Sequence, residues 1–183
     1  MKRFSSFLIF SVALVALSFL NVNAQGLSID DKTTAIGQEV HKRILRLPYY
    51  EVFDHIGFKV DGDTVTLTGK VFNGVNRSDA KAAVERIPGV NKVINNIEIL
   101  PPSRFDDQIR RNLYTRLHNT SGLSGYLWTV NPSVRLIVDR GNITLEGYVR
   151  NRGDYDTMYI IARGIPNSFS VTNNLKIEND VAR

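Results

Sequence analysis

Hydrophobic and polar residues alternate in two stretches of the chain that lie 78 residues apart. In the first stretch, Val65, Leu67 and Val71 alternate with threonine and lysine, and residues 143–149 repeat the alternation. A period of two is typical of a strand with one buried face. Turn-forming residues precede each stretch, and residues 56–60 alternate in the same way before the first turn. Each copy is therefore predicted to contain a β-hairpin.

Apolar residues at helical spacing occur before and after each hairpin, and each stripe marks one face of a helix. The stripes before the hairpins are Ile36, Val40, Ile44 and Leu47 in the first copy, and Phe105, Ile109, Leu113 and Leu117 in the second. Those after the hairpins are Ala80, Ala83, Val84 and Ile87, and Met158, Ile161, Ala162 and Ile165. A proline ends each of the later helices. Residues 93–99 and 171–177 are predicted to form a last strand.

The two copies are related in sequence as well as in pattern. Residues 63–99 align with residues 141–177 without a gap and are identical at 11 of 37 positions. Two unrelated sequences of average composition are identical at about one position in sixteen. The order of elements predicts an α+β fold of two tandem αββαβ domains, each a three-stranded mixed sheet with two helices on one face. The predicted domains are residues 33–100 and 104–178, joined by a short linker at residues 101–103.

The first 24 residues have the pattern of a secretory signal peptide. Lys2 and Arg3 precede an apolar run over residues 7–20, and Ala24 supplies the small residue that a signal peptidase accepts. The run is shorter than the roughly 20 residues that a membrane span needs, which argues against a single anchor. Without cysteine there is no lipid-modified cysteine and no disulfide. A periplasmic or secreted, non-lipidated protein is expected.

The charge of the chain is modest and unevenly distributed. Cleavage after Ala24 lowers the net charge from +5 to +3, because residues 1–24 hold two basic and no acidic residues. This charge, together with the lack of any nucleic-acid-binding motif, argues against a nucleic-acid partner. Residues 103–183 carry a surplus of three positive charges, and most of their basic residues are arginine. Arginine binds phosphate bidentately, which suits a lipid headgroup.

The repeated residues resemble the BON domain, which occurs as tandem copies in secreted bacterial proteins. The pattern G-x-V-x-L-x-G-x-V appears at residues 63–71 and 141–149, with Asp63 in place of the first glycine. The I-P-G-V and V-x-N-x-I segments lie within residues 87–97, and residues 165–175 are a looser counterpart. The resemblance implies the αββαβ fold, a periplasmic or envelope location, no catalysis, and binding to phospholipid membranes.

The residues that could carry chemistry are interpreted as structural. His41, His55 and His118 have no partner in metal-ligand spacing, so no catalytic residue, cofactor or metal is expected. Two pairs of repeated residues are assigned roles in the backbone: Gly69 and Gly147, and Asn95 and Asn173. A glycine within a strand marks a bulge or the close approach of another backbone, here expected to be a packed helix. The asparagines suit hydrogen bonds to the backbone, with a ligand role as the alternative.

A candidate binding site lies in the second copy. Its first helix carries Arg110, Arg111 and Arg116, and an insertion of about nine residues within 120–133 follows that helix. The insertion contains Tyr126, Leu127 and Trp128, and tryptophan and tyrosine favour the boundary between water and lipid. We expect the arginines to bind anionic phospholipid and the loop to act as an apolar wedge. In the alternative, the loop is a lid on its own domain or pairs the two copies.

A second aromatic feature lies on the later helix of the second copy, and its expected contact is the insertion, the first copy or a membrane. Tyr155 and Tyr159 occupy the positions of Arg77 and Lys81 on the later helix, which predicts an aromatic interaction patch. The sequence therefore favours a non-enzymatic envelope protein that binds anionic phospholipid membrane surface. The alternative is a protein–protein adaptor, or a self-associating envelope or stress-response protein, that binds an envelope protein through the aromatic patch of the second domain.

Overall fold

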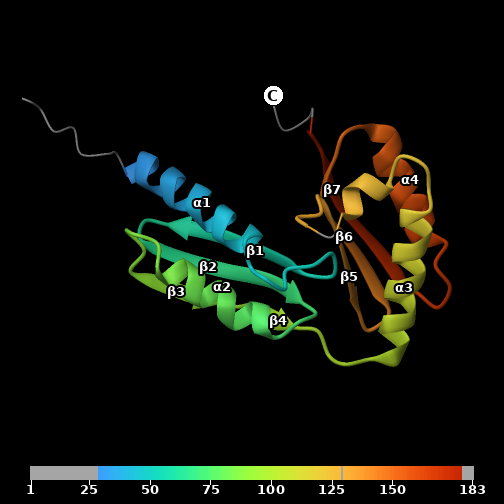
Figure 1. The fold of residues 1–183 in the computed structure, drawn as a ribbon, viewed down its shortest axis with the longest axis horizontal. Helices are drawn as coiled ribbons and strands as arrows, with labels where there is room; N and C mark the ends of the chain where they lie inside the picture. The colour runs from blue at the N-terminus through green and yellow to red at the C-terminus, as the bar shows by residue number, and fades with distance from the viewer. Residues whose placement is uncertain (1–28, 129, 179–183) are drawn as a thin grey trace, which may run out of the picture.

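The computed structural model describes residues 29–128 and 130–178, which form two domains joined near Pro101 (Figure 1). The predicted signal peptide, residues 1–24, lies outside the described residues. The first domain contains helix α1 (Ile29–Leu45), the hairpin β1 (His55–Asp61) and β2 (Thr64–Val71), and helix α2 (Val75–Glu85). It ends with β3 (Lys92–Asn95) and β4 (Glu98–Ile99). β1 is antiparallel to β2, while β3 and β4 pair with β2 in parallel.

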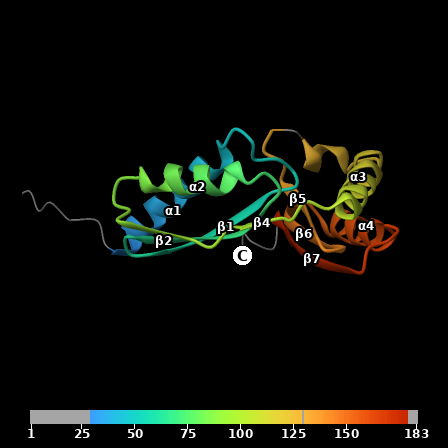
Figure 2. The same cartoon turned by 90° about the horizontal axis from the view of Figure 1, so that it is seen from below.

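The second domain repeats this order. It contains α3 (Arg104–His118), the 3-10 turn η1 (Ser124–Leu127), β5 (Val134–Asp139), β6 (Asn142–Val149), α4 (Arg152–Arg163) and β7 (Ser170–Ile177). The sheet order is β5-β6-β7, antiparallel and then parallel. In each domain both helices lie on one side of the strands (Figure 2). The predicted α+β fold of two tandem αββαβ units with mixed sheets is confirmed.

The alternating residues of the hairpins form the centres of two separate cores. Val65, Leu67 and Val71 are fully buried in the first core, and Ile143, Leu145 and Val149 take their places in the second. The buried side chains of the helices above them differ in size but compensate for each other. Ala80 and Val84 on α2 correspond to Met158 and Ala162 on α4, and all four are fully buried. Exchanging a small and a large residue in this way fills a similar volume, as dense packing requires.

The structure corrects the predicted register between the first helices. The sequence pattern aligned Phe105 with Ile36, but Phe105 is 40% exposed, and α1 and α3 end 73 residues apart, at Leu45 and His118. Because the strands are 78 residues apart, the insertion is five residues rather than about nine. A shift of four residues keeps the same face of a helix inward, so the apolar stripe alone does not fix this register.

Gly69 and Gly147 lie where two backbones meet. Their φ angles are +113° and +111°, and a Cβ at Gly147 would lie 2.0 Å from the carbonyl oxygen of Ser133. At Gly69 the same distance, to the oxygen of His55, is 2.1 Å. The close approach is that of the neighbouring hairpin strand, not of the packed helix that the sequence suggested. Only glycine combines this φ with this space.

Asn95 and Asn173 make equivalent hydrogen bonds in the last strands. Each side-chain oxygen accepts a hydrogen bond from the backbone N–H two residues later, at 3.2 Å in both domains. In the first domain the strand is divided at this point into β3 and β4, whereas β7 continues through it. The repeated asparagines therefore bond to their own backbone, as in an Asx turn.

We predict that Gly147→Ala lowers the free energy of unfolding by about 3 to 5 kcal/mol, because the new methyl group meets a backbone carbonyl at a φ that alanine avoids. Gly125→Ala is the matched control, because nothing lies within 4 Å of the added Cβ. Urea unfolding of both variants measures the difference. Equal stability of the two variants would contradict this account of the strand crossing.

Candidate functional site

The two domains contact each other along β5, the edge strand of the second sheet, on the side that faces the first domain (Figure 1). Residues 134–138 are all buried, so both faces of this strand are covered. The N–H of Leu136 donates to the carbonyl oxygen of Val52 in the first domain, at 2.7 Å. Val52 and Phe53 also pack against the core of the second domain. The segment 49–54 thus closes the edge of the second sheet.

Arg135 connects β5 to this segment and is only 5% exposed. Its Nη1 donates to the carbonyl oxygen of Glu51 at 2.8 Å, and its guanidinium lies 4.0 Å from the ring centroid of Tyr50. Burial lowers the pKa of Arg135, and the neighbouring Tyr50 and Asp54 oppose that effect. A buried guanidinium needs such partners, because desolvation of an unpaired charge is expensive.

Asp54 holds the segment 49–54 in shape and is 1% exposed. Its carboxylate accepts hydrogen bonds from the backbone N–H groups of Glu51 and Phe72, at 2.9 and 2.7 Å, and from Nδ2 of Asn76 at 3.0 Å. Burial raises the pKa of Asp54, while the backbone hydrogen bonds act in the opposite direction. The carboxylate therefore organises the loop that carries Tyr50, Val52 and the Glu51 carbonyl to β5.

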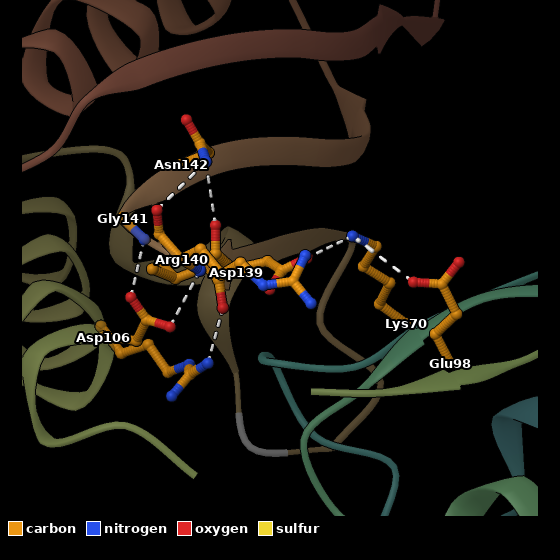
Figure 3. A network of polar contacts seen from close by, with 9 residues as sticks. Lys70, Glu98, Asp106, Asp139, Arg140, Gly141 and Asn142 are labelled. Carbon is orange, nitrogen blue, oxygen red and sulfur yellow. Dashed lines mark hydrogen bonds and ion pairs between the residues drawn. The ribbon is translucent and has the colours of Figure 1, made fainter. Parts of the chain in front are cut away.

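A second polar contact joins the far end of β5 to the first domain (Figure 3). Nζ of Lys70 lies 2.5 Å from Oδ2 of Asp139 and 3.7 Å from Oε2 of Glu98. On the other side of β5, the Asp106 carboxylate accepts from the N–H groups of Arg140 and Gly141, at 3.0 and 2.8 Å. The hairpin turn of the second domain is thus fixed to α3, and β5 is fixed to the first domain.

A polar cleft of about 300 Å³ opens beside this contact. It is lined by His55, Gly69 and Lys70 of the first domain and by Ile137, Asp139, Asn142, Thr144 and Glu146 of the second. Burial lowers the pKa of His55, Glu146 opposes that shift, and Arg135 adds to it. Within residues 29–128 and 130–178, no cluster of three metal-ligating side chains is present.

The three predicted lipid-binding arginines point in different directions. Arg110 is 2% exposed, and its guanidinium donates to the Val138 oxygen at 2.6 Å and lies 4.7 Å from the ring of Phe72. Arg116 is exposed, and its Nη1 donates to the Gly164 oxygen at 2.9 Å. Arg111 is exposed and lines a groove between the domains. Arg110 is therefore a buried contact between domains, unable to reach a headgroup.

The insertion is divided between core and surface. Tyr126 and Leu127 are 4% and 1% exposed and belong to the core of the second domain. The Tyr126 hydroxyl is hydrogen-bonded to the Asp154 carboxylate and accepts from the backbone N–H of Arg150 at 3.1 Å. These two residues form a lid on their own domain, as the alternative interpretation had it. Trp128, which follows them, is 69% exposed.

A row of aromatic rings crosses the domain boundary beside Arg111. The ring of Phe53 lies 6.3 Å from that of Phe72 and 6.2 Å from that of Tyr114, which stacks on His118 at 5.4 Å. Part of this row lines a groove of about 370 Å³, the interdomain groove. Its lining residues are Glu51, Val52, Phe53, Arg111, Tyr114, Thr115 and Leu127. Sequence reasoning missed Phe53 and Phe72, because both stand outside any periodic pattern.

The predicted tyrosine patch on α4 is partly buried. Tyr155 packs against the core, with the Arg152 guanidinium 4.7 Å from its ring. Tyr159 is also partly exposed and has Arg163 at 5.7 Å. Ile160, beside them on the same helix, is 69% exposed. The patch is therefore a mixed surface of arginine, tyrosine and isoleucine.

A sequence model of the BON domain matches residues 32–101 and again residues 105–179, which together cover most of the chain. The chain belongs to the BON domain family. The predicted tandem arrangement is confirmed. BON domain proteins are typically periplasmic or envelope-associated, and they are generally not enzymes. In the described part of this BON protein, no helix is both long and apolar enough to cross a membrane.

Among solved structures, two of CdsD, a structural protein of the type III secretion system of Chlamydia trachomatis, are similar to this BON protein. The C-terminal domain of CdsD is 15% identical over 79% of this chain and 65% of that structure, with a TM-score of 0.32. The second CdsD structure is 13% identical over 81% of this chain and 96% of its own length, with a TM-score of 0.27. No curated protein matches the sequence.

We predict that acidification lowers the free energy of unfolding of this BON protein, and that protonation of His55 is one cause. Because burial lowers the pKa of His55 in the folded state, the unfolded chain binds the proton more tightly. Stability contributed by the neutral imidazole is therefore present above the unfolded pKa, about 6.5, and is lost as the pH falls below it. Urea unfolding between pH 7.5 and pH 5 should show a smaller loss for His55→Gln than for the wild type. His41→Gln, which changes an exposed histidine on α1, should behave like the wild type; an unchanged pH dependence in His55→Gln would contradict the assignment.

Proposed function

We propose that this BON protein docks on the anionic phospholipid surface of the cell envelope, using Arg111 of the interdomain groove and Trp128, which follows the groove residue Leu127 in the chain. The observation that carries the proposal is the exposure of Trp128, 69%, directly after two residues that are fixed in the core. Indole rings favour the interface between water and lipid. We further propose that residues 1–24 are a cleaved signal peptide that delivers the chain to that compartment.

Rigid support makes Trp128 a suitable membrane contact. Leu127 is 1% exposed, and the Tyr126 hydroxyl bonds to the Asp154 carboxylate and the Arg150 backbone. The segment that presents the indole is thus ordered before any lipid is bound. Binding then avoids most of the entropy loss that accompanies the ordering of a loop.

Arg111 supplies the electrostatic part of the proposed contact. It is exposed and shares the interdomain groove with Leu127, the neighbour of Trp128 in the chain. A guanidinium binds a phosphate with two parallel hydrogen bonds. Arg116 is also exposed and adds charge, although one nitrogen is engaged by the Gly164 oxygen. With about 1 kcal/mol from each basic residue near the surface, binding is weak and sensitive to salt.

The first domain takes part through Phe53, which lines the same groove and contacts Tyr114. The groove that Phe53, Arg111 and Leu127 line therefore depends on the docking of the two domains. The second candidate function is that of a protein–protein adaptor, and the exposure of Ile160 beside Tyr159 on α4 favours it. A contact of that kind is independent of lipid and resists moderate salt.

Flotation with liposomes tests the proposal, using the chain that lacks residues 1–24 and vesicles with and without phosphatidylglycerol. We expect binding to the anionic vesicles alone, a blue shift of Trp128 emission, and release at high salt. Arg111→Gln should weaken binding about fivefold, which corresponds to about 1 kcal/mol. Trp128→Ala should weaken binding more than Arg111→Gln does, because the indole no longer enters the interface.

Two control variants match these changes in chemistry but lie elsewhere. Arg86→Gln removes an exposed arginine at the end of α2. Phe169→Ala removes an exposed ring near the start of α3, where Phe105 lies. Both should bind like the wild type. Equal binding to neutral and anionic vesicles, or an equal effect of all four substitutions, would contradict docking through Trp128 and Arg111. No flotation with either kind of vesicle, at low or high salt, would contradict the lipid proposal and favour the adaptor.

A further inference from the structure

The first domain has a groove of about 750 Å³ at the end remote from the second domain, to the left in Figure 1. The start of α1, the β1–β2 turn and the segment after α2 form its walls. Its apolar floor includes Ile36 and Ile87, which are 7% and 4% exposed. Lys32, Asp63 and Asn91 are among the polar residues that line it. Neither the proposed lipid contact nor the interdomain groove includes any of these residues.

The same place in the second domain carries two aromatic rings, Phe105 and Phe169, which are 40% and 76% exposed. Phe105 and Phe169 face each other with centroids 5.8 Å apart. Both rings rest on Gly141, where an added Cβ would lie 2.7 Å from Phe169 and 3.2 Å from Phe105. The second domain thus contains an internal example of what this site accommodates.

The two sites correspond residue by residue. The helix offset of 73 places Lys32 at the position of Phe105, and the strand offset of 78 places Asn91 at that of Phe169. Gly89 and its counterpart Asn167 both have positive φ, +92° and +67°, which supports the alignment. Two rings have therefore been replaced by polar side chains, while the apolar floor beneath them is retained.

The turn beside the groove has changed together with the rings. Asp63 stands where Gly141 lies, and its carboxylate accepts from Nδ2 of Asn91 at 2.6 Å. Gly141 has a φ of +77°, whereas Asp63 is not in the left-handed region. In the first domain a lysine, an aspartate and an asparagine line the groove at the positions where the second domain has a tilted aromatic pair and a glycine.

We propose that this groove binds an aromatic side chain presented by another polypeptide, with a basic residue beside the ring. The ring would take the place that Phe105 and Phe169 fill in the second domain, and the basic group would meet Asp63. Glu39, which also lines the groove, adds a second carboxylate, although Arg43 binds it at 2.7 Å. An anionic lipid is the competing occupant, because Lys32 also lines the groove, and the experiment below separates the two.

Backbone amide NMR of the chain lacking residues 1–24 tests the proposal with three probes. They are the acetylated and amidated dipeptides Phe-Lys and Leu-Lys, and dihexanoyl phosphatidylglycerol below its micelle concentration. We expect saturable shifts of the Thr33, Gly62 and Gly89 amides with Phe-Lys, and weaker binding of Leu-Lys. The variant Lys32→Phe/Asp63→Gly/Asn91→Phe copies the second domain. Its affinity for Phe-Lys should be lower than that of the wild type by at least about tenfold, a difference of about 1.4 kcal/mol.

Control variants keep the test decisive. Lys81→Phe adds an exposed ring on α2 away from the groove and should bind like the wild type. Asn91→Phe alone provides a milder filling of the groove, and thermal unfolding shows whether each variant is folded. The proposal is overturned if Phe-Lys shifts none of these amides, or if its affinity is equal in the wild type and the folded, filled variants. Shifts caused by dihexanoyl phosphatidylglycerol and not by Phe-Lys would assign the groove to lipid and also overturn it.

Discussion

Burial of β5 on both of its faces is the constraint on which the arrangement of the molecule depends. An edge strand exposes unpaired backbone groups, and proteins cover such edges to avoid pairing with other chains. Here the first domain covers it: Val52 accepts from the N–H of Leu136, and Arg135 is buried against Tyr50 and the Glu51 carbonyl. Since a buried guanidinium tolerates little displacement from its partners, this contact favours one relative orientation of the two domains. The polar cleft at His55 and the interdomain groove are consequences of that orientation.

The two domains show how one fold carries different surfaces. Their cores use equivalent positions, down to the exchange of Ala80 and Val84 for Met158 and Ala162. At the helix start, however, the second domain closes with Phe105 and Phe169 where the first has an open groove. Changes of this kind leave the folding pattern intact, because they lie at the rim of the core. Function is therefore expected where the copies differ, at the groove of the first domain and at Trp128 of the second.

The sequence predicted the hairpins, the helices and the tandem arrangement, since a period of two and a helical period report directly which face is buried. It failed where burial depends on the other domain. Arg110 has the composition of a surface residue, yet its neighbours Phe72 and Val138 come from two domains. The groove residue Phe53 stands in a loop without periodicity. The helix register was wrong by four residues because a full turn of helix leaves the apolar stripe unchanged.

Docking of the two domains through β5 is the central claim, because the interdomain groove exists only if they hold one orientation. Residual dipolar couplings of the backbone amides, measured for both domains of the chain lacking residues 1–24, test it most directly. Domains that are fixed to each other share one alignment tensor, so the couplings of residues 31–100 and 104–178 should fit the structure together. Two tensors of different magnitude would show domains that move independently, and would contradict a composite surface built from both.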